Sequence, residues 1–90
     1  MKARARVIIS GYVQGVFFRL TAEREASSHG VKGWVMNQMD GRVEAVFEGE
    51  KDDVEHMVRW CHHGPPYARV SSVDVEWQDY TGEFRNFRMC

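Results

Sequence analysis

The sequence contains few of the residues that cross-link or anchor a chain. It has only two cysteines, Cys61 and Cys90, which are too few for a disulfide framework. We expect both to be reduced thiols in a cytoplasmic protein, although the sequence also allows them to pair with each other or between chains. The apolar run near the N-terminus, Val7-Ile8-Ile9, is far shorter than a signal peptide or a membrane span of ~20 residues. We therefore expect neither secretion nor membrane insertion.

A strong net charge is also missing. Lysine and arginine number 12 and aspartate and glutamate 13, so the formal net charge is −1. This balance argues against a general nucleic-acid binder, which normally carries a basic excess. The charge is nevertheless uneven, because four cations precede the first carboxylate of the chain: Lys2, Arg4, Arg6 and Arg19. We interpret the first three as part of a charged outer strand face.

The chain does contain enough apolar material for one core. Of its 90 residues 43% are hydrophobic, including five phenylalanines, three tyrosines and three tryptophans. A chain of this size buries roughly 60–70% of its unfolded surface. We therefore expect a single domain over residues 1–90.

Periodicity divides the first part of the chain into two strands and a helix. Residues 4–13 alternate between apolar and polar side chains, which predicts a half-buried strand. Apolar residues three and four apart predict a helix from about Phe18 to His29, and Gly30 is a suitable stop. Residues 31–38 are predicted to form a second strand.

The pair Asp40-Gly41 predicts a hairpin. It lies between two alternating runs, and Asp-Gly suits a type I′ turn, whose two central residues both have positive φ. In the strand that follows, alternate residues face one side of the sheet: Val43, Ala45 and Phe47. The residues between them face the other side: Glu44, Val46 and Glu48.

The second part of the chain predicts one more helix and two strands. Apolar residues recur at helical spacing from about Lys51 to His63, and Gly64-Pro65-Pro66 ends that helix. A fourth strand is predicted over 69–77 and a short fifth over 84–89. The order β-α-β-β-α-β, with a short terminal strand, predicts an α+β ferredoxin-like sandwich: one antiparallel sheet with both helices on one face. That fold alone implies no function.

Residues 11–19, GYVQGVFFR, join the first strand to the first helix. At such a junction, backbone N–H groups and the helix dipole together favour an anion. Gly15 allows the chain to curve close to a ligand. Arg19 opposes the dipole unless an anion is bound, and its planar fork matches two phosphate oxygens. A surface arginine whose stem covers apolar neighbours is the alternative, and these residues alone leave both open.

Four segments resemble the acylphosphatases: Gly11–Arg19, Gly33-Trp34-Val35-Met36-Asn37, Asp40-Gly41-Arg42-Val43-Glu44-Ala45 and Gly64-Pro65-Pro66. The resemblance covers nearly the whole chain, with the order of the elements intact. Met39 occupies a position where that family often has proline, which alters the approach to a turn and no proposed catalytic group.

The resemblance implies metal-independent hydrolysis of acyl phosphates to a carboxylate and inorganic phosphate, without a cofactor. It implies that Arg19 binds the phosphate and that Asn37 orients the attacking water. Without the resemblance we would interpret Asn37 as a residue that flanks a turn. The backbone cradle for the phosphoryl group would be formed by Gln14, Gly15, Val16, Phe17 and Phe18. The implied partner is a small molecule, with no nucleic acid or membrane involved, and we expect a monomer.

Other reactive residues fit this chemistry less well. Neighbours on a helix diverge by about 100°, so Cys61-His62-His63 cannot easily grip one metal ion, and we expect no metal site. A phosphatase pattern Cys-x5-Arg is absent because Tyr67 occupies the arginine position, so Cys61 is predicted to be a core thiol. We expect His56 to be solvated and His29 to close the first helix, neither acting as a catalytic base.

A binding module is the competing class. An RNA-binding domain of this fold would place aromatic residues on the outer face of the third strand, where Glu44, Val46 and Glu48 are predicted instead. A metal carrier would need paired cysteines in the first loop, which has none. A non-catalytic anion-binding or regulatory module with the same site remains the alternative.

Overall fold

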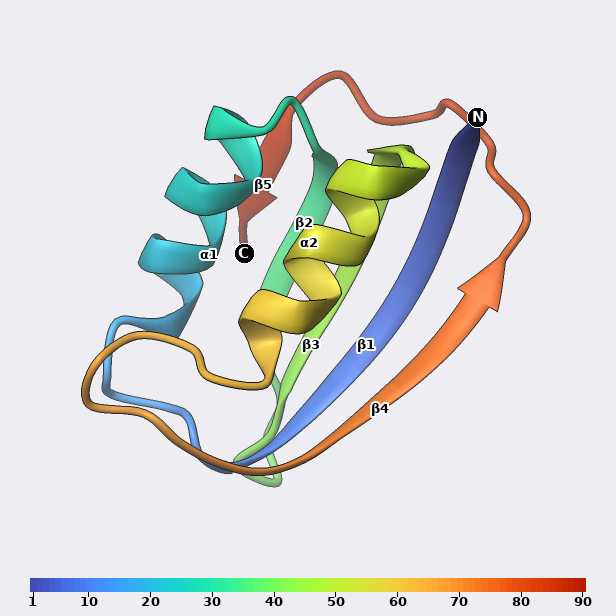
Figure 1. The fold of residues 1–90 in the computed structure, drawn as a ribbon. Coiled ribbons are helices and arrows are strands. Elements are labelled where there is room, and N and C mark those ends of the chain that lie inside the picture. The colour runs from blue at the N-terminus through green and yellow to red at the C-terminus, as the bar shows by residue number, and fades with distance from the viewer.

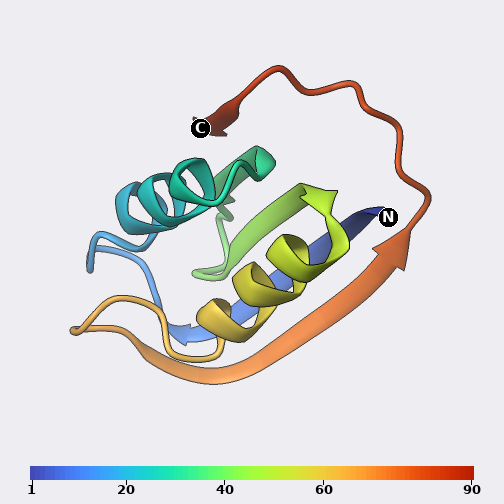
Figure 2. The same ribbon diagram turned by 45° about the horizontal axis from the view of Figure 1, so that its top comes forward.

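The computed structural model describes all 90 residues and contains two helices and five strands. Along the chain these are β1 (Lys2–Tyr12), α1 (Phe18–Ser28), β2 (Lys32–Asn37), β3 (Val43–Glu50), α2 (Lys51–Cys61), β4 (Arg69–Gln78) and β5 (Phe87–Met89). Both helices cover the same face of the sheet (Figures 1 and 2). The predicted ferredoxin-like fold is confirmed. Neither helix is long and apolar enough to cross a membrane.

The sheet has the strand order β4-β1-β3-β2-β5. The pairs β1–β3, β1–β4 and β2–β3 are antiparallel, as predicted, whereas β5 runs parallel to β2. The reason is visible in Figure 1: β4 ends at the end of the sheet where β2 begins, and the following connection crosses that end. It therefore delivers β5 in the same direction as β2, and the sheet is mixed.

The core lies between the sheet and the two helices. The alternation predicted for the strands is confirmed in their central parts, where alternate residues are fully buried in the core: Ala5, Val7 and Ile9 of β1, and Val43, Ala45 and Phe47 of β3. Apolar residues of both helices close the core from above: Phe18, Ala22 and Ala26 from α1, and Val54, Met57 and Cys61 from α2. Burial raises the pKa of the Cys61 thiol far above its usual value, so this cysteine is an inert core residue, as predicted.

The helix ends follow the sequence closely. α1 ends at Ser28, with His29 as its C-cap and Gly30 at φ 70° immediately after it. Glycine adopts a positive φ without steric strain, so Gly30 is a favourable residue at the C-terminal end of α1. α2 ends at Cys61, two residues earlier than predicted, since His62 is already the cap.

The turn between β2 and β3 differs from the predicted type I′ turn. Gly41 has a φ of 96°, but Asp40 has a negative φ, because Phe17 is the only non-glycine residue with a positive value. The Gly41 N–H donates to the Gln38 carbonyl at 3.2 Å, and the Gln38 N–H donates to the Arg42 carbonyl at 2.8 Å. These bonds close a three-residue loop with glycine in its last position, a common alternative to the two-residue turn.

The face of the sheet without helices is more buried than the sequence suggests. Glu48, predicted on this outer face, is only 2% exposed. The connection between β4 and β5 covers it, and the Thr81 N–H of this connection donates to the Glu48 carboxylate at 2.9 Å. Arg4 Nη1, from β1, also donates to this carboxylate, at 3.0 Å. Burial acts to raise the pKa of Glu48, but the hydrogen bonds from Thr81, Arg4 and Gly82 outweigh it and hold that pKa below the usual range.

The cations of β1 are paired with glutamates across this face. Lys2 pairs with Glu50, and Arg6 Nε donates to Glu44 at 2.7 Å, while both cations remain substantially exposed. The predicted charged strand face is therefore correct for these two cations. The Arg4 side chain is only 16% exposed and belongs to the buried network of Glu48.

Candidate active site

The β1–α1 loop (residues 13–17) is held by buried side chains at both of its ends. Val13 and Val16 are almost fully buried, and so is Phe18, the first residue of α1. The Phe18 ring meets the edge of Trp60 at a centroid distance of 5.2 Å. A side chain at Gly64, just after α2, would collide with the Phe18 ring. The start of α1 is therefore fixed against the end of α2.

The backbone of this loop changes handedness twice. Gly15 has a φ of 76°, Val16 has a negative φ, and Phe17 returns to the left-handed region at φ 65°, ψ 25°. A left-handed conformation costs a residue with a side chain about 1–2 kcal/mol. Packing does not account for it at Phe17, whose side chain is 70% exposed. Left-handed residues in a turn are one element of the concave, N–H-lined nests that bind anions.

The N–H groups of this region have no acceptor within the protein. None of the backbone N–H groups of residues 14–20 donates a hydrogen bond to a protein atom. The first N–H of α1 with a partner is that of Thr21, which donates to the Phe17 carbonyl at 3.0 Å. No acidic side chain lies in the first helical turn to accept from the others. Free main-chain donors at a helix N-terminus are an arrangement that suits an anion.

Arg19 extends from the first turn of α1 over the same region. One guanidinium N–H donates to the Cys90 carbonyl at 2.8 Å, and the Cys90 N–H donates to the Val35 carbonyl at 2.9 Å. The segment after β5 thus ties the guanidinium to β2. Arg19 makes no other hydrogen bond and no ion pair, so most of its five donors are free for a ligand. No sequence pattern identifies Cys90, because its backbone carbonyl is the group that accepts.

Asn37 is the last residue of β2 and is half-buried beside this loop. Its backbone pairs with Val43, and its side-chain amide makes no hydrogen bond within the protein. A cavity of about 350 Å³ brings together five of the predicted site residues: Gly15, Phe17, Phe18, Arg19 and Asn37. Its other lining residues, which the sequence analysis did not identify, are Val13, Leu20 and Met89. The approach requires no direct pairing of β1 with β2, because both flank β3.

Gln14 and Val16 do not line this cavity. The Gln14 side chain points to the β2–β3 turn, where Nε2 donates to the carbonyls of Gln38 at 2.7 Å and Arg42 at 2.9 Å. Val16 is buried beneath the loop and lines a neighbouring apolar cavity that also contains Phe17 and Leu20. Neither of these two predicted cradle residues is therefore brought to the cavity.

The cavity contains no histidine, cysteine or carboxylate among its lining residues. Arg19 is its only charged side chain, and Asn37 is its only other polar side chain. Groups that move protons or bind metals lie elsewhere, including His29 and His56, which approach each other at the opposite end of α1. His56, expected to be solvated, is partly so: its side chain is 35% exposed and one ring nitrogen is hydrogen-bonded to Glu25.

Comparison with known proteins gives consistent matches over almost the entire chain. A model of the family described as Acylphosphatase matches residues 5–89. An acylphosphatase from Pelotomaculum thermopropionicum is 57% identical over 89 residues, which cover 99% of this chain and 97% of that protein. One from Roseiflexus is 60% identical over 85 residues, covering 94% and 91%. The structure of an acylphosphatase from Coxiella burnetii matches with a TM-score of 0.93 at 37% identity, covering 99% of this chain and 93% of that one.

Proposed function

The chain belongs to the acylphosphatase family of enzymes, and we propose that it hydrolyses acyl phosphates in the cavity between the β1–α1 loop and Asn37. One observation carries the proposal. A loop and helix start whose N–H groups have no acceptors, a guanidinium with free donors and an amide without partners lie at one cavity. Each of these groups suits one requirement of phosphoryl transfer to water.

Phosphate binding is assigned to the main chain and to Arg19. The N–H groups of residues 14–20 would donate to the phosphoryl oxygens, while the guanidinium forks onto two of them. Phosphoryl transfer depends mainly on position and charge stabilisation, which these donors provide without a metal ion. The contact with Cys90 holds Arg19 in place before the substrate arrives, so less side-chain freedom is lost on binding.

The attacking water is assigned to Asn37. An amide can accept a hydrogen bond from water and donate another, which fixes the direction of attack. The water oxygen forms a bond to phosphorus as the bond to the acyl oxygen breaks, and the carboxylate leaves with the bonding electrons. The water proton passes to a phosphoryl oxygen. Because a carboxylate is a weak base, no general acid is needed, in keeping with a cavity that lacks one.

The acyl group is assigned to the apolar rim of the cavity. Phe17 and Leu20 line both this cavity and the neighbouring apolar one, and Met89 is 48% exposed at its edge. These side chains provide contact area without hydrogen bonds that would select one acyl group. All the proposed groups come from one chain, so the proposal requires only a monomer and no cofactor.

The test compares hydrolysis of benzoyl phosphate, inhibition by inorganic phosphate and folding in a set of variants. Arg19→Ala should lower kcat/KM by roughly 10³-fold or more and abolish phosphate inhibition. Arg19→Lys should recover little, because the planar fork is lost. Asn37→Ala should lower kcat about 10²–10³-fold and leave phosphate inhibition intact. Arg59→Ala, which removes an exposed arginine from α2, is the matched control and should behave as wild type.

Two outcomes would contradict the proposal. Loss of phosphate inhibition in Asn37→Ala, with the fold retained, would refute the division between phosphate and water. A wild-type chain that binds phosphate and turns over neither benzoyl phosphate nor a phosphate monoester would favour the non-catalytic binding module.

A further inference from the structure

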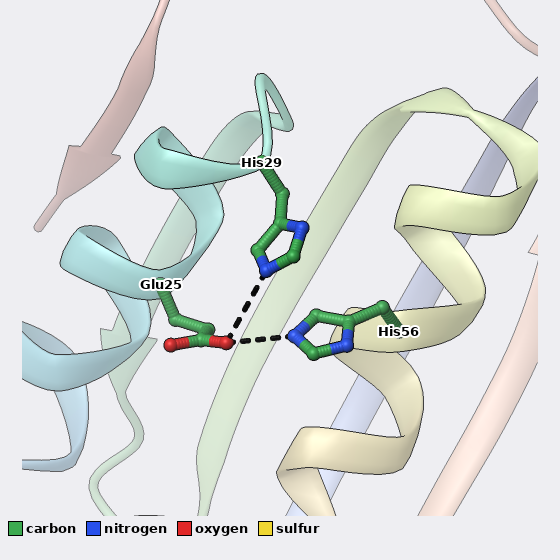
Figure 3. Close-up of side chains that lie close together, drawn as sticks. All are labelled: Glu25, His29 and His56. Atoms are coloured by element: carbon green, nitrogen blue, oxygen red, sulfur yellow. Dashed lines mark hydrogen bonds and ion pairs between the residues drawn. The ribbon is translucent and has the colours of Figure 1, made fainter.

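Three metal-ligating side chains converge between the two helices, away from the β1–α1 loop. Glu25 and His29 lie one turn apart at the C-terminal end of α1, and His56 reaches toward them from α2 (Figure 3). The β1–α1 loop lies at the other end of α1 (Figure 1). The cluster is therefore separate from the proposed catalytic cavity.

We propose that Glu25, His29 and His56 form a binding site for one divalent transition-metal ion of the zinc type. Glu25 Oε2 lies 2.7 Å from His56 Nε2 and 3.5 Å from His29 Nε2, and the ligand atoms all lie within 4.8 Å of one another. Tetrahedral zinc with bonds of ~2.0–2.2 Å holds its ligand atoms roughly 3.3 Å apart. Small side-chain rotations would bring these three atoms to that spacing around one ion.

The donor set indicates which ions the site prefers. Two imidazole nitrogens and one carboxylate form a three-ligand set that leaves a fourth position for water. Imidazole suits zinc, copper and nickel, whereas magnesium and calcium prefer sites composed of oxygen. The three side chains are between 32% and 36% exposed, so an ion from solution can reach them.

A fourth residue lies beside His29. Asp53 Oδ1, from the first turn of α2, is 3.7 Å from Nδ1 of His29, the ring nitrogen that faces away from Glu25, and does not form a hydrogen bond with it in this structure. A carboxylate hydrogen-bonded to the outer nitrogen of a metal-binding histidine fixes its tautomer and leaves the inner nitrogen free to coordinate. Within the proposal, a small movement of Asp53 toward Nδ1 makes it a positioning residue.

The cluster is incomplete as a simple ion-pair network. His56 donates a good hydrogen bond to Glu25, but His29 Nε2 is at 3.5 Å and its geometry does not meet that of a hydrogen bond. The two imidazole rings are also held close together, with their centroids 4.0 Å apart. One cation between the rings satisfies both inner nitrogens and the carboxylate together.

The consequence of binding is a cross-link between α1 and α2. Glu25 and His29 come from α1, whereas His56 comes from α2, so one ion joins two elements that otherwise meet over a short length. A ligand that binds only the folded state raises stability by mass action. The ion would act on stability and take no part in hydrolysis.

The test is zinc binding to the reduced protein with Cys90→Ser, which removes the exposed thiol as a competing ligand. Calorimetry with zinc chloride should give one ion per chain. The ring proton resonances of His29 and His56 should shift, while those of His62 and His63 stay unchanged. Each of Glu25→Gln, His29→Gln and His56→Gln should weaken binding at least tenfold and remove the rise in melting temperature caused by zinc. Asp53→Asn should weaken binding roughly 10–100-fold, as expected of an orienting partner.

His62→Gln and His63→Gln are the matched controls, because they remove exposed imidazoles from the end of α2 and should bind zinc as the parent does. Absence of zinc binding by the folded parent would overturn the proposal. Binding that survives His56→Gln, or that disappears in His62→Gln or His63→Gln, would also overturn it. Far-ultraviolet circular dichroism of each variant distinguishes loss of the site from loss of the fold.

Discussion

At the scale of single residues, the main feature of the molecule is backbone strain within the proposed phosphate cradle. Phe17 is the only residue other than glycine with a positive φ, and most of its side chain is in solvent. Strained backbone persists only where its surroundings hold it, and such residues cluster at functional sites. Buried Val16 and Phe18 on either side of Phe17 provide that restraint.

Phe17→Gly should therefore leave the free energy of unfolding unchanged or raise it by up to about 1.5 kcal/mol. Glycine relieves a cost of roughly 1–2 kcal/mol for the left-handed conformation and loses about 0.5–1 kcal/mol through greater unfolded-state entropy. Phe17→Val should destabilise, because a β-branched residue tolerates this conformation least. Urea unfolding of both variants measures the difference. A glycine variant less stable than the valine variant would show that backbone strain does not govern stability at this position.

At the scale of elements, two contacts fix the geometry of the site. The Gln14 side chain joins the β1–α1 loop to the β2–β3 turn, so the loop and Asn37 are positioned by a common clamp. The contact between Arg19 and Cys90 joins α1 to the segment after β5. The site is thus assembled from parts that are distant in sequence.

Gln14→Glu should open the first clamp. It places a carboxylate against two carbonyl oxygens that now accept from an amide, which should cost about 1–3 kcal/mol of stability. Inorganic phosphate should also inhibit more weakly, since the loop loses its anchor. Gln78→Glu, which adds the same charge at the far end of β4, is the control and should leave phosphate inhibition unchanged. Equal effects of the two variants on inhibition would point to net charge instead of the clamp.

The sequence predicts the elements well because their causes are local. Alternation along β1 and β3, helical spacing in α1 and α2, and Gly30 after the first helix are all properties of short windows. The turn at Asp40-Gly41 was predicted in the right place with the wrong geometry, since a three-residue loop also accommodates glycine in its last position. The placement of Arg19 near Asn37 followed from family resemblance, and the geometry of the cavity agrees with it.

At the scale of the whole molecule, the features that the sequence did not predict depend on segments far apart in the chain. The parallel pairing of β5, the burial of Glu48 and the Arg19–Cys90 contact all result from where the last twelve residues cross the sheet. The spacing of Glu25 and His29 is visible on one helix, but His56 joins them only through the packing of α2. Patterns within a short stretch of sequence contain no information on how distant segments of the chain pack against one another.

The Glu48 network predicts a loss of stability in acid. The folded-state pKa of Glu48 is lowered, so its contribution is fully present above the unfolded-state value of about 4.3 and is lost as the pH falls through the folded-state value. Glu48→Gln should therefore destabilise by about 1–3 kcal/mol at pH 7. The difference from wild type should be smaller at about pH 3 than at pH 7, because protonation of Glu48 in acid brings wild type closer to the neutral variant.

Urea unfolding of wild type and Glu48→Gln at both pH values measures this difference. Glu55→Gln, which removes a carboxylate without hydrogen bonds or ion pairs, is the control and should show a small effect at either pH. A Glu48→Gln effect that grows in acid would contradict the sign of the pKa shift.

The unpaired N–H groups of residues 14–20 have a consequence for which amino-acid replacements this protein can accept during evolution. Main-chain donors are present whatever side chain a codon specifies, with proline as the sole exception. Side-chain replacements in residues 14–20 can therefore change the surroundings of a bound anion without removing the main-chain N–H donors, provided that the backbone conformation of the loop is kept. Selection on this segment would act on its backbone conformation more than on the identity of its side chains.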